Sequence, residues 1–279
     1  MPYSIGQNIN NHTMKRRNFI LTAGAAGIAA STMGITQAAE KEDAKKYLEL
    51  RTYTASNAEK KEKLIQVLDA ALVPALNRQG IKPVGIFWTN KELNENNADF
   101  DLSVFVLFPH VSPEAAMTCN AKLLADKDYL KAAAPILEAP MKEPIYDTLK
   151  TTLLLGFEKC PTIEVPVKSN DRLFQLRFYK SYNFERNAAK VHMFDHGGEM
   201  PLFRVKGMNP VFFGDTLYGD KMPNLTYMLG FENETARKAA WKAFAESPEW
   251  AEIRDKPMYK NTANTITNIV LKPSPGSQI

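Results

Sequence analysis

Two places in the chain carry an arginine two residues before a tyrosine. Arg51 and Tyr53 form the first pair, and Arg177 and Tyr179 form the second. A guanidinium group binds carboxylates and other anions, and a phenol hydroxyl donates to or accepts from polar ligand atoms. These four residues are therefore the candidates for binding an anionic or phenolic ligand. The alternative is a structural role, in which they form internal salt bridges that link two sheets, because buried charges generally find partners within the protein.

Both pairs lie in stretches that alternate between apolar and polar residues, as half-buried strands do. Because successive side chains of a strand point to opposite faces, each arginine shares a face with its tyrosine. The neighbouring leucines and phenylalanines take the other face. We expect the apolar face to meet the helices, which would point Arg51 and Arg177 into the interior between two sheets.

A second group of candidates is the histidine-rich stretch 192–199. His192, Asp195, His196 and Glu199 follow the spacing i, i+3, i+4 and i+7, which is one face of a helix. Such a face can ligate a transition metal, and a single histidine can be an axial ligand of heme. The two glycines at 197 and 198 each cost a helix about 1 kcal/mol relative to alanine. We therefore predict no tightly held metal and no cofactor, and we keep His192, His196 and Glu199 as secondary ligand-binding candidates; the alternative is a solvated helix end.

Several common chemistries have no motif in this chain. A nucleophile elbow, a dinucleotide-binding fingerprint and a phosphate-binding loop are all missing. Cys119 and Cys160 belong to no zinc-ribbon spacing, and we expect buried free thiols, although an oxidising compartment would permit a disulfide between them. A formal net charge of +4 over 279 residues gives no argument for binding nucleic acid. Whether the protein is an enzyme stays open at this point.

The elements that must position these residues occur twice in the same order. Residues 40–157 and 173–279 each read as strand, helix, strand, strand, helix, strand, and a linker occupies 158–172. Corresponding prolines and glycines punctuate both copies: Pro74, Gly80 and Pro83 in the first, Pro201, Gly207 and Pro210 in the second. This order is the ferredoxin-like βαββαβ motif, which leaves one sheet face bare. We therefore predict an α+β fold in which tandem ferredoxin-like repeats form a two-sheet α/β barrel; the alternative is a homodimer in which each unit pairs with another chain.

Local signals mark the helix ends. Leucines at positions 64, 68, 72 and 76 share one helical face, and Gly80 follows as a stop. Serine followed by proline, at Ser112 and again at Ser247, is typical of a helix start.

Residues 1–39 form a segment that resembles a secretory signal, and the signal itself starts at Met14. The pair Arg16 and Arg17 precedes an apolar run over 22–35, which ends in small residues before Glu40. An arginine pair in this position is typical of a twin-arginine signal. We therefore expect a periplasmic or secreted protein with no transmembrane span in its mature chain; the alternative is an uncleaved anchor.

The second copy contains four longer motifs: HMFDHGGE at 192–199, NPVFFG at 209–214, MPNLTYMLGF at 222–231 and SPEW at 247–250. With these motifs, the stretch 47–272 resembles the NIPSNAP family within the dimeric α/β-barrel superfamily. The resemblance implies the barrel fold and a role in binding a small molecule or a protein partner, with no agreed reaction. Relatives on this fold include cofactor-free monooxygenases and heme enzymes, and a homo-oligomer is a further expectation.

Two observations would separate these functions. A pocket enclosed within one repeat and lined by arginine, tyrosine or histidine would favour an enzyme. A barrel interior filled by side chains would favour binding at the surface.

Overall fold

Eight antiparallel strands close into one barrel in the computed structural model, which describes residues 47–95 and 98–279. The signal segment predicted for 1–39 lies outside the described residues. The strands are β1 (Tyr47–Thr54), β2 (Gly85–Trp88), β3 (Ser103–His110), β4 (Thr148–Gly156), β5 (Leu173–Lys180), β6 (Asn209–Tyr218), β7 (Asn224–Phe231) and β8 (Thr265–Pro273).

The barrel has two halves of four neighbouring strands each. The first half, residues 47–156, runs β4-β1-β3-β2, and the second half, residues 173–279, runs β8-β5-β7-β6. Both follow the strand order of the ferredoxin-like motif, which confirms the predicted fold class. β2 pairs with β8 and β4 pairs with β6, so the halves join along both edges within one chain. The alternative in which another chain completes the barrel is therefore wrong, while the oligomeric state stays a prediction.

The helices begin and end where local signals place them. They are α1 (Ala58–Val67), a π-helical segment η1 (Leu68–Leu72), α2 (Val73–Arg78), the 3₁₀ segment η2 (Ala98–Phe100), α3 (Pro113–Ala125), α4 (Lys127–Ala132), α5 (Ala134–Leu137), α6 (Phe184–Asp195), α7 (Glu199–Val205), α8 (Glu234–Ala245), α9 (Pro248–Arg254) and the 3₁₀ segment η3 (Pro257–Tyr259). The predicted caps are confirmed: Ser112 Oγ accepts from the Ala115 amide at 3.2 Å, and Ser247 Oγ from the Trp250 amide at 3.3 Å. Gly80 stops the first helical run with a φ of 77°, a left-handed conformation that glycine adopts without strain.

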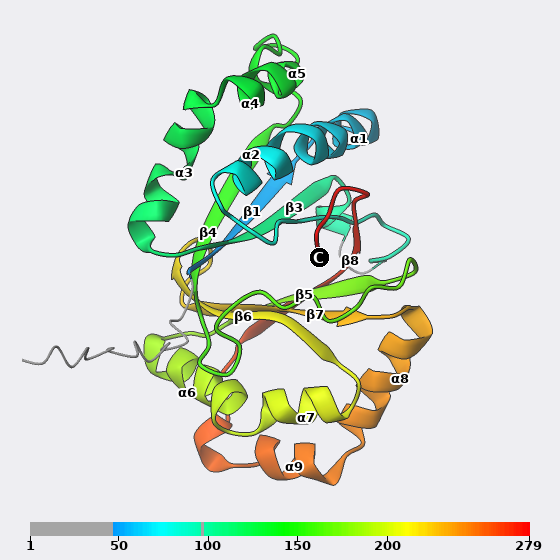
Figure 1. Cartoon of the computed structure of the whole chain (residues 1–279). Helices are drawn as coiled ribbons and strands as arrows, with labels where there is room; N and C mark the ends of the chain where they lie inside the picture. Colours follow the sequence, from blue (N-terminus) through cyan, green and yellow to red (C-terminus); the bar gives the residue numbers. More distant parts are fainter. Residues whose placement is uncertain (1–46, 96–97) are drawn as a thin grey trace, which may run out of the picture. The chain divides into compact units, whose positions relative to one another are not determined.

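Each half carries its own helices on the outside of its strands. α1 and α3 pack against β3, and α3 also contacts β1. In the second half, α6 and α8 pack against β7 while α7 packs against β6 (Figure 1). Each half therefore has two buried surfaces, one toward the barrel interior and one toward its helices.

The barrel interior is filled with apolar side chains. Leu48, Leu50, Phe174 and Leu176 belong to its core, and the Phe87 and Phe174 rings meet across the halves with centroids 4.9 Å apart. The expectation that the polar face of β1 and β5 points inward is therefore wrong. An interior lined by buried apolar side chains offers a charge few hydrogen-bonding groups, so the arginines take the outer face, where helices supply polar partners.

The cysteines and the lengths of the helices can also be compared with the predictions. Cys119 and Cys160 are free and buried, as expected for packing thiols. None of the described helices is both long and apolar enough to cross a membrane.

Candidate functional site

Strand β5 places Arg177 and Tyr179 on the outer face of the second half, beneath its helices. An Arg177 guanidinium nitrogen donates to Tyr179 Oη at 2.9 Å, and the guanidinium carbon lies 4.6 Å from the centre of the Trp241 ring. Arg177 Nε is buried without a hydrogen-bond partner. Among the described residues Arg177 forms no ion pair with a carboxylate, and its hydrogen-bond partner is a neutral phenol.

The charge of Arg177 is nevertheless retained. Burial opposes the charged form, but Tyr227, Tyr179 and the charge of Glu199 together outweigh that effect and raise the pKa of the guanidinium above its usual value. Tyr227 is fully buried, and its hydroxyl lies 3.3 Å from Tyr179 Oη. A permanent cation therefore sits beneath the helices without a protein counter-charge bonded to it.

A cavity of about 450 Å³ opens beside Arg177. We call it the Arg177 pocket. It lies between the outer face of the second-half strands and the helices that cover them. Its lining includes the following side chains: Arg177, Tyr179, Lys190, Met193, Glu199, Trp241, Phe244, Trp250, Arg254, Tyr259, Thr262 and Ile266. Aromatic walls with a few convergent polar groups are typical of small-molecule sites, and 300–1,000 Å³ is roughly their usual volume range.

Lys190 and Glu199 form a buried ion pair in the lining of this pocket. Lys190 Nζ lies 3.1 Å from Glu199 Oε2 and 4.4 Å from the centre of the Phe194 ring. Burial raises the pKa of Glu199, and the lysine charge partly offsets that effect. The pair is neutral as a unit, so the unbalanced charge near it is that of Arg177.

The corresponding arginine of the first half is closed off. Arg51 is only 4% exposed, and its Nε donates to Glu49 Oε1 at 2.6 Å while a terminal nitrogen donates to Asn120 Oδ1 at 2.8 Å. The second oxygen of Glu49 lies 2.7 Å from His110 Nε2. Tyr53 is buried beside them, and burial raises the pKa of its hydroxyl. Arg51 and Tyr53 thus serve the packing of the first half, and Arg51 pairs within its own half rather than across the barrel.

The stretch 192–199 does not form one helical face. α6 ends at Asp195, Gly198 takes a left-handed φ of 101°, and Glu199 begins α7. His192 Nδ1 lies 2.9 Å from Tyr259 Oη, whereas Glu199 pairs with Lys190. The predicted i to i+7 arrangement is therefore wrong, because the glycine turn changes the direction of the chain. The two glycines instead allow close packing, since a Cβ on Gly197 would lie 2.5 Å from Tyr259 Oη.

Neither histidine of this stretch lines the Arg177 pocket. His192 faces Tyr259 outside the lining, and His196 lies near the surface. A heme bound in this pocket would therefore have no axial histidine from residues 192 or 196. The hypothesis that one of these two histidines is an axial heme ligand is therefore not supported at this pocket.

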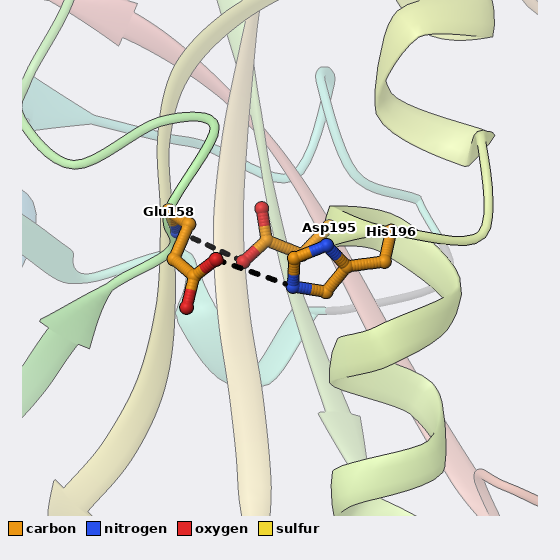
Figure 2. A group of neighbouring side chains, drawn as sticks. All are labelled: Glu158, Asp195 and His196. Atoms are coloured by element: carbon orange, nitrogen blue, oxygen red, sulfur yellow. Dashed lines mark hydrogen bonds and ion pairs between the residues drawn. The ribbon is translucent and has the colours of Figure 1, made fainter.

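Asp195 and His196 form a different cluster with Glu158 (Figure 2). Their candidate ligand atoms lie within 4.8 Å of one another. Both oxygens of Asp195 already accept backbone amides, from Glu158 at 2.8 Å and from Lys159 at 2.9 Å. The imidazole of His196 lies 3.4 Å from the Glu158 carboxylate at the surface. This cluster ties the segment after β4 to the end of α6, and the absence of a tightly held metal stays a prediction.

A larger hollow of about 740 Å³ lies where the two halves meet, next to Leu93 and Thr235. Its charged lining residues are three acids and three bases. The acids are Glu92, Asp171 and Glu234, and the bases are Arg172, Lys238 and Lys272. This hollow contains none of the predicted site residues, so we place the candidate site in the Arg177 pocket.

Lys190 was not predicted as a site residue from the sequence. It lies on α6 with Met193 and Phe194 three and four positions later, so it falls among apolar side chains. A lysine on the apolar face of a helix is the signal that could have identified it.

Comparison with known proteins supports the fold and the resemblance of the second half. Residues 174–278 match the sequence model of the NIPSNAP family. No curated protein matches the chain in sequence.

Among solved structures, a monooxygenase-like protein of Lactobacillus acidophilus has a TM-score of 0.55 at 8% identity, covering 82% of this chain and 94% of the other. A monooxygenase-like protein of Fusobacterium nucleatum has a TM-score of 0.54 at 10% identity, covering 83% and 93%. A NIPSNAP-like domain protein of Burkholderia xenovorans has a TM-score of 0.34 at 17% identity, covering 37% and 85%. At these identities the first two likenesses show the α/β-barrel fold.

Proposed function

We propose that the protein binds a small organic anion with an aromatic body in the Arg177 pocket. The observation that carries this proposal is the unpaired charge of Arg177. A cation that is partly withdrawn from water favours a compensating anion; Arg177 is half-buried and has none bonded to it, whereas Glu49 supplies one for the buried Arg51 in the first half. The position equivalent to Glu49 in the second half is Gln175, which is neutral. The carboxylate or phenolate of a ligand would supply the counter-charge that Gln175 does not give to Arg177.

The walls of the pocket define the rest of the ligand. Trp241, Phe244 and Trp250 present aromatic surface, and Tyr179 offers a hydroxyl next to the guanidinium. Aromatic rings of protein and ligand attract each other in stacked or edge-to-face geometry. A flat ring bearing a single negative group matches both features.

The test uses 4-nitrobenzoate, measured by calorimetry and by quenching of Trp241 and Trp250. We expect saturable binding, and no binding of the uncharged analogue 4-nitrobenzamide. Arg177→Met should weaken 4-nitrobenzoate binding about 10- to 100-fold, because it removes a charge-assisted hydrogen bond. The matched control is Arg204→Met, which removes an exposed arginine paired with Glu164 outside the pocket. Equal binding by both variants would refute the proposal.

Catalysis of the monooxygenase type is the second candidate. It is supported by the place of the pocket within one half, its arginine and tyrosine, and the likeness to monooxygenase-like proteins. The filled barrel interior supports binding without turnover equally well. Oxygen uptake in the presence of a hydroxylated aromatic compound separates the two, since a binding protein consumes none.

We further propose that the NIPSNAP-like character extends over the first half, because that half repeats the strand order and the proline and glycine positions of the second.

We also propose that the chain is exported. The support for export is Arg16 and Arg17 ahead of an apolar run that ends near Ala39. Replacing both arginines with lysine should retain the protein in the cytoplasm of its host. Normal periplasmic yield of that variant would contradict the twin-arginine route.

A further inference from the structure

Glu199 is the acidic side chain in the lining of the Arg177 pocket. It is 2% exposed, and its hydrogen bond within the described residues is the one from Lys190 to Oε2. This carboxylate therefore lines a cavity that also holds an arginine, and one of its two oxygens accepts the hydrogen bond from Lys190.

We propose that Glu199 accepts a proton from the ligand, and that the ligand class is a weak acid, a phenol or an enolisable carbonyl compound. This inference rests on the proposed function, because it concerns a ligand held at Arg177. The ligand enters in its neutral form and is held as its anion by Arg177 and Tyr179.

The step balances within the pocket. The O–H or C–H bond of the ligand breaks, and its electron pair stays on the ligand. A new O–H bond forms on the Glu199 carboxylate. No oxidant or further reactant takes part. Negative charge moves from Glu199 to the ligand, so the net charge of the site does not change, while Lys190 exchanges the Glu199 carboxylate for the ligand anion as its counter-charge.

The surroundings of Glu199 suit this exchange. Two cations, Lys190 on α6 and Arg177 on β5, interact electrostatically with Glu199 and favour its charged form. Two neutral titratable groups, Tyr227 on β7 and Tyr259 on η3, also interact with its charge. Burial favours its protonated form. When Glu199 becomes neutral, Lys190 keeps contact with the face of Phe194 and with Met193 Sδ at 3.2 Å, and the new ligand anion lies nearby.

The test uses 4-nitrophenol at a pH below its own pKa, where the free probe is neutral. The phenolate absorbs visible light, so the spectrum reports which form is bound. We expect the wild type to bind the phenolate. Calorimetry in two buffers with different heats of ionisation should show no proton passing to the buffer. Glu199→Gln should also bind the phenolate but release a full proton per ligand. The matched control is Glu249→Gln, an exposed carboxylate paired with Lys206 outside the pocket, which should behave as wild type.

An infrared measurement on the wild type keeps the inference testable if Glu199→Gln fails to fold. The carbonyl stretch of a protonated carboxyl group should appear when 4-nitrophenol binds. Binding of the neutral phenol, or release of a full proton by the wild type, would overturn the inference. Binding of 4-nitrobenzoate without binding of 4-nitrophenol would overturn it and leave the proposed function standing. Failure of both probes to bind would overturn both.

Discussion

Arg51 and Arg177 occupy equivalent positions in the two halves, yet their surroundings differ in one decisive respect. Glu49 neutralises Arg51 at 2.6 Å, whereas Gln175 stands two residues before Arg177. Gln175 uses its amide oxygen to accept from Trp241 Nε1 at 2.5 Å, which holds the indole ring near the guanidinium. A carboxylate two residues before the arginine therefore distinguishes the paired Arg51 from Arg177, which forms no ion pair with a carboxylate among the described residues.

The largest loss of thermal stability is expected for Glu49→Gln, which gives the first half the neutral side chain that the second half has at this position. Glu49→Gln removes the counter-charge of Arg51 and the partner of His110 in a buried site. Breaking a buried ion pair costs about 3 to 5 kcal/mol, which lowers the melting temperature of a domain this size by roughly 6 to 20 °C. Thermal unfolding followed by circular dichroism measures it. A shift of a degree or less would show that Arg51 does not depend on Glu49.

Arg177→Met should have a smaller effect on stability than Arg51→Met. Replacing Arg177 leaves no carboxylate stranded and removes mainly its contact with Trp241, worth about 0.5 to 2 kcal/mol. Replacing Arg51 leaves Glu49 buried with only His110 beside it. The melting temperatures of the two variants give the comparison directly. Equal losses would mean that Arg177 has a structural partner as strong as Glu49.

The alternation of β1 and β5 predicts which residues share a face but not which layer each face meets. In this barrel both faces are buried, one by the opposite half and one by helices, so hydrophobicity alone marks neither as the interior. The decision depends on partners far away in the sequence. Asn120 approaches Arg51 across 69 residues, and Trp241 approaches Arg177 from α8.

The fold itself could be predicted because turn and cap signals recur in both halves. The arginine and tyrosine pairs were also identified from spacing. Lys190 and Glu199 were not paired in the prediction, because the turn at Gly198 brings them together from two different helices.

A change of pH should have opposite effects on the stability contributed by Glu49 in the first half and by Glu199 in the second. His110 and Arg51 hold the pKa of Glu49 below its ordinary value of 4.5 despite burial, so its contribution is present above that pH and is lost as pH falls through the lowered pKa. Burial raises the pKa of Glu199 above 4.5, so its contribution is present below that pH and is lost as pH rises through the raised pKa.

Melting curves of wild type and single variants across pH 3 to 8, roughly the range in which carboxyl groups of this kind titrate, measure these contributions. The stability advantage of wild type over Glu49→Gln should grow as pH rises. Its advantage over Glu199→Gln should shrink as pH rises. The same sign for both carboxylates would contradict the difference between the halves.

The smallest change in thermal stability is expected when a chelator is added, because the candidate metal ligands Glu158, Asp195 and His196 are expected to hold no metal tightly. Because both Asp195 oxygens are engaged by backbone amides, a chelator should leave the melting temperature of the purified protein unchanged. Elemental analysis of the same sample is the independent check. A stoichiometric metal that is lost together with thermal stability would contradict this prediction.

The most direct measurement is the affinity of Gln175→Glu for 4-nitrobenzoate, compared with wild type by calorimetry. This change puts a carboxylate at the position that Glu49 holds in the first half. Trp241 Nε1 keeps an oxygen to donate to, whereas the hydrogen bond from Gln175 Nε2 to Asn268 Oδ1 is lost. We predict that the variant folds and melts no lower than wild type by more than a few degrees. We also predict that it binds the anion at least about tenfold more weakly, because its own carboxylate now occupies the guanidinium. Unchanged affinity in a folded Gln175→Glu protein would contradict the claim that the free charge of Arg177 makes the site.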